Sequence, residues 1–332
     1  MTRIFILMTQ NPSLPHLSRR GVFGLAFGAA ALAARPGLAQ TQPLSVVATT
    51  GMIADAARQV GGDMVEVKAL MGAGVDPHSY RQTRSDIVAL TRADVVLWHG
   101  LYLEAQLEDF LLDLAARRPV VAVAEGLPRD VLIAHDDYAD AKDPHVWMDP
   151  ALWQQVVRRL RDALIEVHPE GEATFRANAE RYIAELRELE GYAANVLASV
   201  PPDNRVLLTS HDAFNYFGAA YGFEVIGIQG ISTESEAGLK RIAELVDLLV
   251  ARDIGAVFVE TSVSDRNIRA LIEGAAAAGH AVEIGGELYS DAMGEPGTYE
   301  GTYIGMIDHN ATTIARALGG TAPARGMADR LN

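Results

Sequence analysis

Short apolar runs alternate with amphipathic segments along the first third of the chain. The runs have the length and β-branched content of strands, and the segments between them have helical spacing. The expected strands are 44–49, 65–70, 94–99 and 119–124. The expected helices are 52–60, 85–92 and 103–116. Strands that alternate with helices indicate βαβ units around a mostly parallel sheet.

The same alternation returns in the second half of the chain, without any similarity of sequence to the first. The expected strands there are 205–209, 224–228, 256–260 and 281–284. The expected helices are 213–221, 235–252, 265–278 and 303–318. Between the halves, a polar loop at 135–144 precedes a helix at 153–167.

Residues 170–200 are rich in Ala, Glu, Arg and Leu, with Pro169 before them and Pro201 after them. This punctuation is typical of one helix, which at 1.5 Å per residue would be roughly 45 Å long. The alternative is two shorter helices broken near Gly191. We therefore expect an α/β protein of two lobes, each with a mostly parallel four-stranded sheet flanked by helices, joined by one long spine helix.

The N-terminus has the layout of a signal peptide. Ser18-Arg19-Arg20 precedes an apolar run at 21–34, which is too short to span a bilayer. Gly37-Leu38-Ala39 then offers a small-x-small cleavage pattern. The paired arginines suggest a twin-arginine signal, although ordinary signals also carry arginines. The predicted divisions are a cleaved signal peptide at 1–39, a first lobe at 40–168, the spine at 169–200 and a second lobe at 201–332.

Composition narrows the class of protein. The chain has 332 residues, of which 49% are hydrophobic and 21% charged, as in globular proteins. A net charge of −15 argues against nucleic acid or an anionic membrane as the partner. The absence of cysteine excludes disulfides, thiolate metal sites and an acylated-cysteine anchor. We therefore expect a periplasmic monomer that is not a lipoprotein.

Three of the nine histidines lie where expected strands give way to loops. His78 and His145 each end an Asp-Pro-His tripeptide, and His211 follows the strand at 205–209. Proline stiffens the backbone before each of the first two histidines. Loops at the carboxyl ends of parallel strands are where such sheets bind ligands. Taken singly, each histidine could equally be a hydrogen-bonded turn residue.

Asp291 is a fourth candidate, because it follows the strand at 281–284 and a Gly285-Gly286 turn. Alone it could be a solvated loop residue. Three imidazoles and one carboxylate together form a closed set that suits Zn²⁺. Mn²⁺ is also possible with a bidentate carboxylate, although an imidazole-rich set favours zinc. Two candidates precede the expected spine and two follow it, so one ion would join the lobes.

Several long segments resemble one known family, the cluster A-I metal-binding receptors of bacterial ABC importers, also called the TroA/ZnuA-like zinc and manganese binders. The segments are 71–80, 143–153, 207–236, 285–294 and 301–310. The resemblance implies two α/β lobes joined by one long helix, a single metal ion between them and delivery to an ABC transporter permease in the inner membrane. By match of motif, the metal ligands would be His78, His145, His211 and Asp291.

Two features depart from specialised members of that family. Zinc-dedicated members often carry a histidine-rich loop near 125–144, where this chain has only His135. Manganese-dedicated members usually have glutamate at the third ligand position, where this chain has His211. Of the other histidines, His99 is expected to pack or to line the cleft and His168 to cap the approach to the spine. His280 and His309 are expected to be turn and surface-helix residues. Candidate acceptors for the second imidazole nitrogens are Asp76, Asp143, Asp149, Asp212 and Glu260.

Two other functions use similar residues. A zinc hydrolase needs an open coordination position for water, which Asp291 would close, and no HExxH motif is present. A receptor for a metal chelate or other small molecule would need a polar or aromatic pocket instead of a site for a bare ion. We expect a non-catalytic receptor, in which the stiff helix limits metal release to small movements near Asp291.

Overall fold

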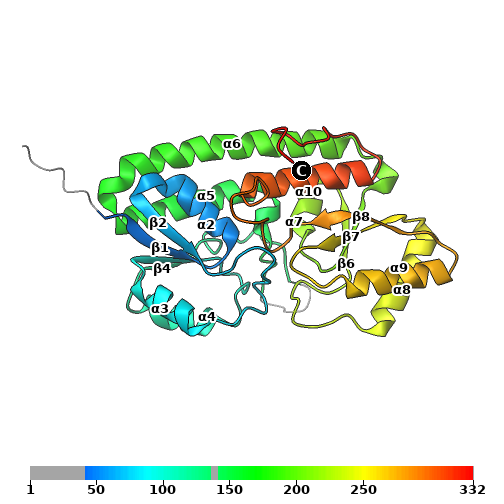
Figure 1. Ribbon diagram of the computed structural model, residues 1–332, viewed down its shortest axis with the longest axis horizontal. Helices are drawn as coiled ribbons and strands as arrows, with labels where there is room; N and C mark the ends of the chain where they lie inside the picture. Colours follow the sequence, from blue (N-terminus) through cyan, green and yellow to red (C-terminus); the bar gives the residue numbers. More distant parts are fainter. Residues whose placement is uncertain (1–41, 136–140, 332) are drawn as a thin grey trace, which may run out of the picture. The chain divides into compact units, whose positions relative to one another are not determined.

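The computed structural model describes residues 42–135 and 141–331, and the predicted signal peptide lies outside the described residues. The first four strands form one parallel sheet in the order β2-β1-β3-β4 (Figure 1). Their bounds are β1 Leu44–Ala48, β2 Val65–Ala69, β3 Val95–Trp98 and β4 Val120–Ala122. All four coincide with expected strands.

Helices cover both faces of this sheet (Figure 1). The sheet and these helices form the first lobe. The helices are α2 Gly51–Gly61, α3 Arg84–Arg92, α4 Glu108–Ala115 and α5 Pro150–Val167. Alternate strand residues point to opposite faces: Val46 packs in the cluster with α2 and α5, and Val47 packs in the cluster with α3 and α4. Three 3₁₀ turns lie in this part of the chain: η1 Gly62–Met64, η2 Val146–Met148 and η3 Pro169–Gly171.

Helix α4 begins five residues later than the sequence predicts. Gly100, Leu101 and Tyr102 all have left-handed backbones, with φ of 82°, 54° and 68°, and a right-handed helix cannot start there. Buried Glu104 holds this turn against β3 by accepting the N–H of His99 at 2.8 Å. The turn therefore ends the strand sharply and delays the helix.

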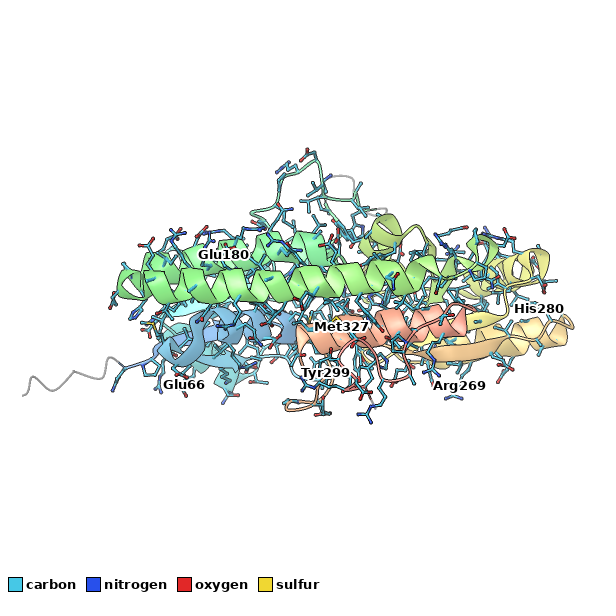
Figure 2. All side chains as sticks on the ribbon, turned by 90° about the horizontal axis from the view of Figure 1, so that it is seen from above. Glu66, Glu180, Arg269, His280, Tyr299 and Met327 are labelled. Carbon is cyan, nitrogen blue, oxygen red and sulfur yellow. The ribbon has the colours of Figure 1, made fainter. Side chains whose placement is uncertain are left out.

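Helix α6 Glu172–Ala198 is one unbroken helix of 27 residues, so the alternative of two helices is wrong. It lies against both halves of the chain (Figures 1 and 2). Among the described residues, none of the helices is both long and apolar enough to cross a membrane. In the predicted loop at 135–144, residues 136–140 lie outside the described part, and Ala134 and Lys142 form an antiparallel bridge.

The second lobe contains four more parallel strands after the 3₁₀ turn η4 Pro202–Asn204. The strands are β5 Val206–Thr209, β6 Glu224–Gly227, β7 Ala256–Glu260 and β8 Glu283–Leu288. The α/β class is confirmed, but these strands form two parallel pairs, β5-β6 and β7-β8, instead of one four-stranded sheet. Strands β5 and β7 are in contact but are not assigned to one sheet. Two residues after β5, the backbone N–H of His211 donates to the Glu260 side chain at the end of β7 instead of to a backbone carbonyl.

The second lobe's helices are α7 Asn215–Tyr221, α8 Leu239–Arg252, α9 Arg266–Ala277 and α10 Tyr303–Ala317. Strand β8 starts later than predicted and continues through Gly285 and Gly286, where a turn was expected. A Cβ on Gly285 would lie 2.9 Å from the Phe258 ring, and one on Gly286 would overlap Thr313. The glycines therefore serve close packing against α10 and β7.

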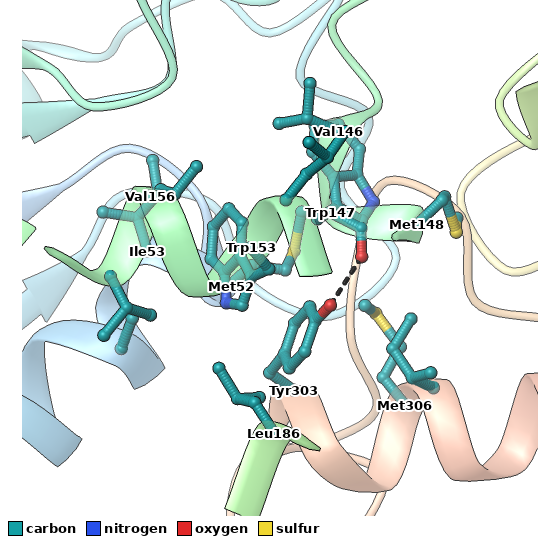
Figure 3. Packing of buried hydrophobic residues seen from close by; sticks show 14 of the residues in the cluster. Met52, Ile53, Val146, Trp147, Met148, Trp153, Val156, Leu186, Tyr303 and Met306 are labelled. Carbon is teal, nitrogen blue, oxygen red and sulfur yellow. Dashed lines mark hydrogen bonds between the residues drawn. The ribbon is translucent and has the colours of Figure 1, made fainter. Parts of the chain in front are cut away.

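Helix α10 is a second connection between the lobes. It packs along α6 and β8, while its first residue, Tyr303, reaches the first lobe. The Tyr303 N–H donates to Asp55 of α2 at 3.0 Å, and its hydroxyl donates to the Trp147 carbonyl at 2.7 Å (Figure 3). Its ring stacks on Trp153 of α5 with centroids 5.2 Å apart. The predicted connecting helix is α6, and α10 adds contacts between the lobes without carrying the chain from one to the other.

Continuity of α6 at Gly191 predicts that Gly191→Ala stabilises the protein. The position is exposed, and an added Cβ meets no atom within 4 Å. Alanine in a helix interior is favoured over glycine by about 0.5–1 kcal/mol. Urea unfolding should therefore show a free energy of unfolding raised by about that amount.

The matched control is Gly305→Ala in α10, where an added Cβ would overlap the Tyr299 carbonyl. This variant should be less stable than the parent chain. A loss of stability in Gly191→Ala would contradict an unbroken α6.

Candidate metal centre

His78 lies in the loop that follows β2, and Asp76 fixes the backbone of that loop. The Asp76 carboxylate accepts the N–H of His78 at 2.9 Å, which is the geometry of an Asx turn. Its other oxygen accepts the hydroxyl of Ser79 at 2.8 Å and that of Thr233, from the second lobe, at 2.6 Å. The first Asp-Pro-His tripeptide thus holds its histidine through the backbone and joins the lobes beside it.

The second tripeptide repeats this turn and adds a contact to the ring. The Asp143 carboxylate accepts the N–H of His145 at 2.9 Å and lies 2.7 Å from its Nδ1. Asp143 is itself held by Asn215 Nδ2 at 3.1 Å and, at its carbonyl, by the Tyr216 hydroxyl at 2.9 Å. With Nδ1 engaged, His145 presents Nε2 to the centre.

His211 lies two residues after the end of β5, and there Glu260 takes the role that Asp143 has for His145. One carboxylate oxygen of Glu260, the last residue of β7, accepts the N–H of His211 at 2.9 Å, and the other bonds to its Nδ1. Among the five candidate acceptors, Asp143 and Glu260 therefore hold imidazole rings. Asp76 holds its own loop, and Asp149 caps α5 by accepting the N–H of Ala151 at 2.8 Å.

The structure brings all four predicted residues together, with one donor atom from each inside a group no wider than 4.8 Å. Nε2 of His78 and Nε2 of His145 lie 3.3 Å apart. The Asp291 oxygens lie 3.3 Å from His145 Nε2, 3.1 Å from His211 Nε2 and 3.9 Å from His78 Nε2. A tetrahedral zinc site with bonds near 2.0–2.1 Å has edges of about 3.3 Å. The spacing suits one small ion.

The donor atoms are buried and hydrogen-bond poor. All four side chains are at most 3% exposed. Among the described residues, His211 Nε2 and both Asp291 oxygens have no partner in hydrogen-bonding geometry. Buried polar atoms without partners are destabilising. A cation shared by the four donors would satisfy these atoms at once.

The pKa values of the three histidines also favour a bound cation. Burial lowers the pKa of His78 to about 4. Burial also lowers the pKa of His145, but the carboxylates of Asp143 and Asp291 outweigh burial and raise this pKa to about 9. Burial also lowers the pKa of His211, but the carboxylates of Asp291 and Glu260 outweigh burial and hold this pKa well above its ordinary value. A divalent ion that binds here would take the place of the positive charge that these carboxylates favour on the rings.

Two residues support the centre: Trp147, which was missed from the sequence, and His99, which was expected only to pack or to line the cleft. Trp147 lies two positions after His145 in η2, and its ring contacts the His145 ring edge-on at 5.2 Å. His99 Nε2 lies 2.7 Å from the carbonyl of Pro144, next to His145. Because burial lowers the pKa of His99 to about 3, its ring is neutral and can donate there. Trp147 could have been found from the sequence, because it lies within the segment 143–153 that carries the second Asp-Pro-His tripeptide.

Residues 46–317 match the model of the ZnuA family, described as zinc-uptake complex component A, periplasmic. The chain belongs to this family. The ZnuA family comprises metal-binding receptors of importers, and membership confirms both the predicted resemblance and the predicted class of function. The family description also supports an exported location.

Two similar ZnuA-like relatives are named for different metals. The manganese-binding lipoprotein MntA of Bacillus subtilis (strain 168) is 48% identical over 85% of this chain and 92% of its own length. The zinc-binding protein TroA of Treponema pallidum (strain Nichols) is 42% identical over 87% of this chain and 92% of its own length. A solved structure of the periplasmic zinc-binding protein TroA superposes with a TM-score of 0.81 at 43% identity, covering 83% of this chain and 99% of that one.

One prediction conflicts with these relatives. MntA is named a lipoprotein, so membership of the ZnuA family does not support the expectation that this chain is not one. The expectation rested on the absence of cysteine from this sequence. The exported location stands, and the manner of anchoring is not given by the family.

The contacts of Glu260 predict a loss of metal affinity in Glu260→Gln. The amide cannot accept both the backbone N–H and the ring N–H of His211, so the ring loses its fixed orientation. Removing such an outer partner typically lowers metal affinity about 10–100-fold. A chelator-competition titration with Zn²⁺ measures the dissociation constant.

Glu224→Gln is the control. Glu224 begins β6, opposite the start of β5 rather than the end near His211, and it forms an exposed pair with Arg252. It should bind zinc like the parent chain. Equal affinity in both variants would show that Glu260 does not support the site.

Proposed function

We propose that this chain captures one divalent transition-metal ion with His78, His145, His211 and Asp291, and delivers it to an ABC importer's permease. The observation that carries the proposal is the convergence of these four buried donors within 4.8 Å. Two of them precede α6 and two follow it, so the bound ion links the lobes.

Zinc is the proposed preferred ion, and manganese is the second. Three imidazoles and one carboxylate suit tetrahedral zinc, and imidazole-rich sets bind zinc more tightly than manganese. The relatives' names include both metals. A bidentate Asp291 would supply the extra coordination that manganese accepts. Which ion the protein carries in the cell then depends on supply as well as on affinity.

We further propose that the centre is not catalytic. A hydrolytic zinc site keeps one position open for water, whereas Asp291 completes the set of four donors here. A chelate receptor is also disfavoured. The imidazole donors lie 3.1–3.9 Å from the Asp291 oxygens, and all four donors lie within 4.8 Å of one another, which leaves room for a bare ion and not for an organic ligand.

The proposed form is a periplasmic monomer, exported by cleavage of residues 1–39. A monomer is sufficient, because one chain supplies all four donors. The proposed division is a first lobe at 40–168, a spine at 169–200 and a second lobe at 201–332. Since α6 and α10 both connect the lobes, metal release should depend on small movements near Asp291 and not on a wide hinge rotation.

The direct test is His211→Ala. Removing one of four ligands should weaken zinc binding by on the order of a hundredfold or more, beyond the effect of losing an outer partner. Chelator-competition titration gives the dissociation constant, and thermal melting checks that the variant folds.

His280→Ala is the matched control. His280 lies at the outer end of the second lobe, where its Nε2 bonds to the Ile254 carbonyl at 2.8 Å (Figure 2). It should bind zinc with the parent affinity. Unchanged affinity in His211→Ala would refute the proposed centre.

A further inference from the structure

Trp147 connects two candidate ligands that come from different lobes. It is fully buried, two residues after His145. Its indole N–H donates to the carbonyl of Ser290 at 2.8 Å, and Ser290 immediately precedes Asp291. The sequence separation of this contact is 143 residues, so the hydrogen bond is made across the boundary between the lobes.

The indole ring is itself held firmly. It packs edge-on between the rings of His145 and His99, at centroid distances of 5.2 and 5.0 Å. The Trp147 carbonyl accepts the Tyr303 hydroxyl at 2.7 Å (Figure 3). Since the ring and the backbone are both fixed, the indole N–H is a preorganised donor with little freedom to follow a moving partner.

The loop that carries Asp291 is also attached to the rest of the second lobe. Asn310 of α10 accepts the N–H of Tyr289 at 2.9 Å and donates to its carbonyl at 2.7 Å. Tyr289 is thus held by the second lobe. The carbonyl of the next residue, Ser290, is held by the first lobe, while the Ser290 hydroxyl lies 3.0 Å from the Ser262 hydroxyl of the second lobe. The peptide group between Ser290 and Asp291 is oriented by the indole, and so is the direction in which the Asp291 side chain leaves the backbone.

We propose that Trp147 is a positioning residue for metal retention, resting on the proposed function above. Its indole N–H sets the Asp291 carboxylate against the three imidazoles, and the ion leaves when this hydrogen bond breaks and the loop withdraws. A buried carbonyl without its donor is destabilised. Loss of the indole N–H therefore lets the loop move and shortens the residence time of the ion.

The test compares Trp147→Phe with Trp153→Phe. Both replace a fully buried tryptophan, but Trp153 Nε1 has no hydrogen-bond partner among the described residues, so its variant loses ring volume without losing such a bond. The first readout is the dissociation rate of Zn²⁺ into excess chelator by stopped flow. The second is the visible absorption spectrum of Co²⁺ bound in place of zinc, with Asp291→Ala as the reference for a lost carboxylate.

Trp147→Phe should release zinc about tenfold faster or more, and its cobalt spectrum should shift towards that of Asp291→Ala. Trp153→Phe should keep the parent rate and spectrum even if its melting temperature falls. A parent-like rate and spectrum in Trp147→Phe would overturn the proposal, as would equal acceleration in both variants. Failure of the parent chain itself to bind zinc or cobalt would instead overturn the proposed function.

If Trp147→Phe does not fold, Tyr303→Phe decides the question. It removes the hydroxyl that holds the Trp147 carbonyl and keeps the ring that stacks on Trp153. A smaller acceleration of zinc release in the same direction supports the proposal. A release rate equal to that of the parent chain contradicts it.

Discussion

Four polar donors lie together in a buried space between two lobes. Much of the architecture serves to hold these donors in place. Burying imidazoles and a carboxylate is unfavourable unless each is paired. Asp143 and Glu260 each accept both the backbone N–H and the ring Nδ1 of a histidine, so that two rings have one possible orientation. Asp291, which faces these rings, then needs a cation to balance the three acids.

The bracing of the lobes follows from the same requirement. A donor set split between lobes keeps its geometry only if the lobes keep their relative position. Helix α6 runs along both, and α10 enters the first lobe through Tyr303, whose N–H, hydroxyl and ring each make a contact there. Both helices thus hold the lobes in place. In the proposed function, the ion is therefore retained and released through small movements near Asp291.

Much of this arrangement could be read from the sequence, because it depends on local patterns. The alternation of apolar runs gave the strands, and the Asp-Pro-His tripeptides with His211 and Asp291 gave the four residues that meet. The start of α4 could not be predicted, because it depends on left-handed φ values at Leu101 and Tyr102, which are unusual for such residues. The choice of Glu260 as a ring acceptor depends on a contact between β7 and the residue after β5, which the sequence alone does not rank. The Trp147–Ser290 contact is equally non-local.

In the proposed centre, the two residues before α6 and the two after it close around one ion. The most direct measurement is a crystal structure of the zinc-loaded protein, with anomalous scattering at the zinc edge to locate the ion. We expect zinc bound by Nε2 of His78, His145 and His211 and by Asp291, with bonds of about 2.0–2.2 Å and no water ligand. Zinc bound elsewhere, or a water molecule in the position assigned to Asp291, would contradict the account.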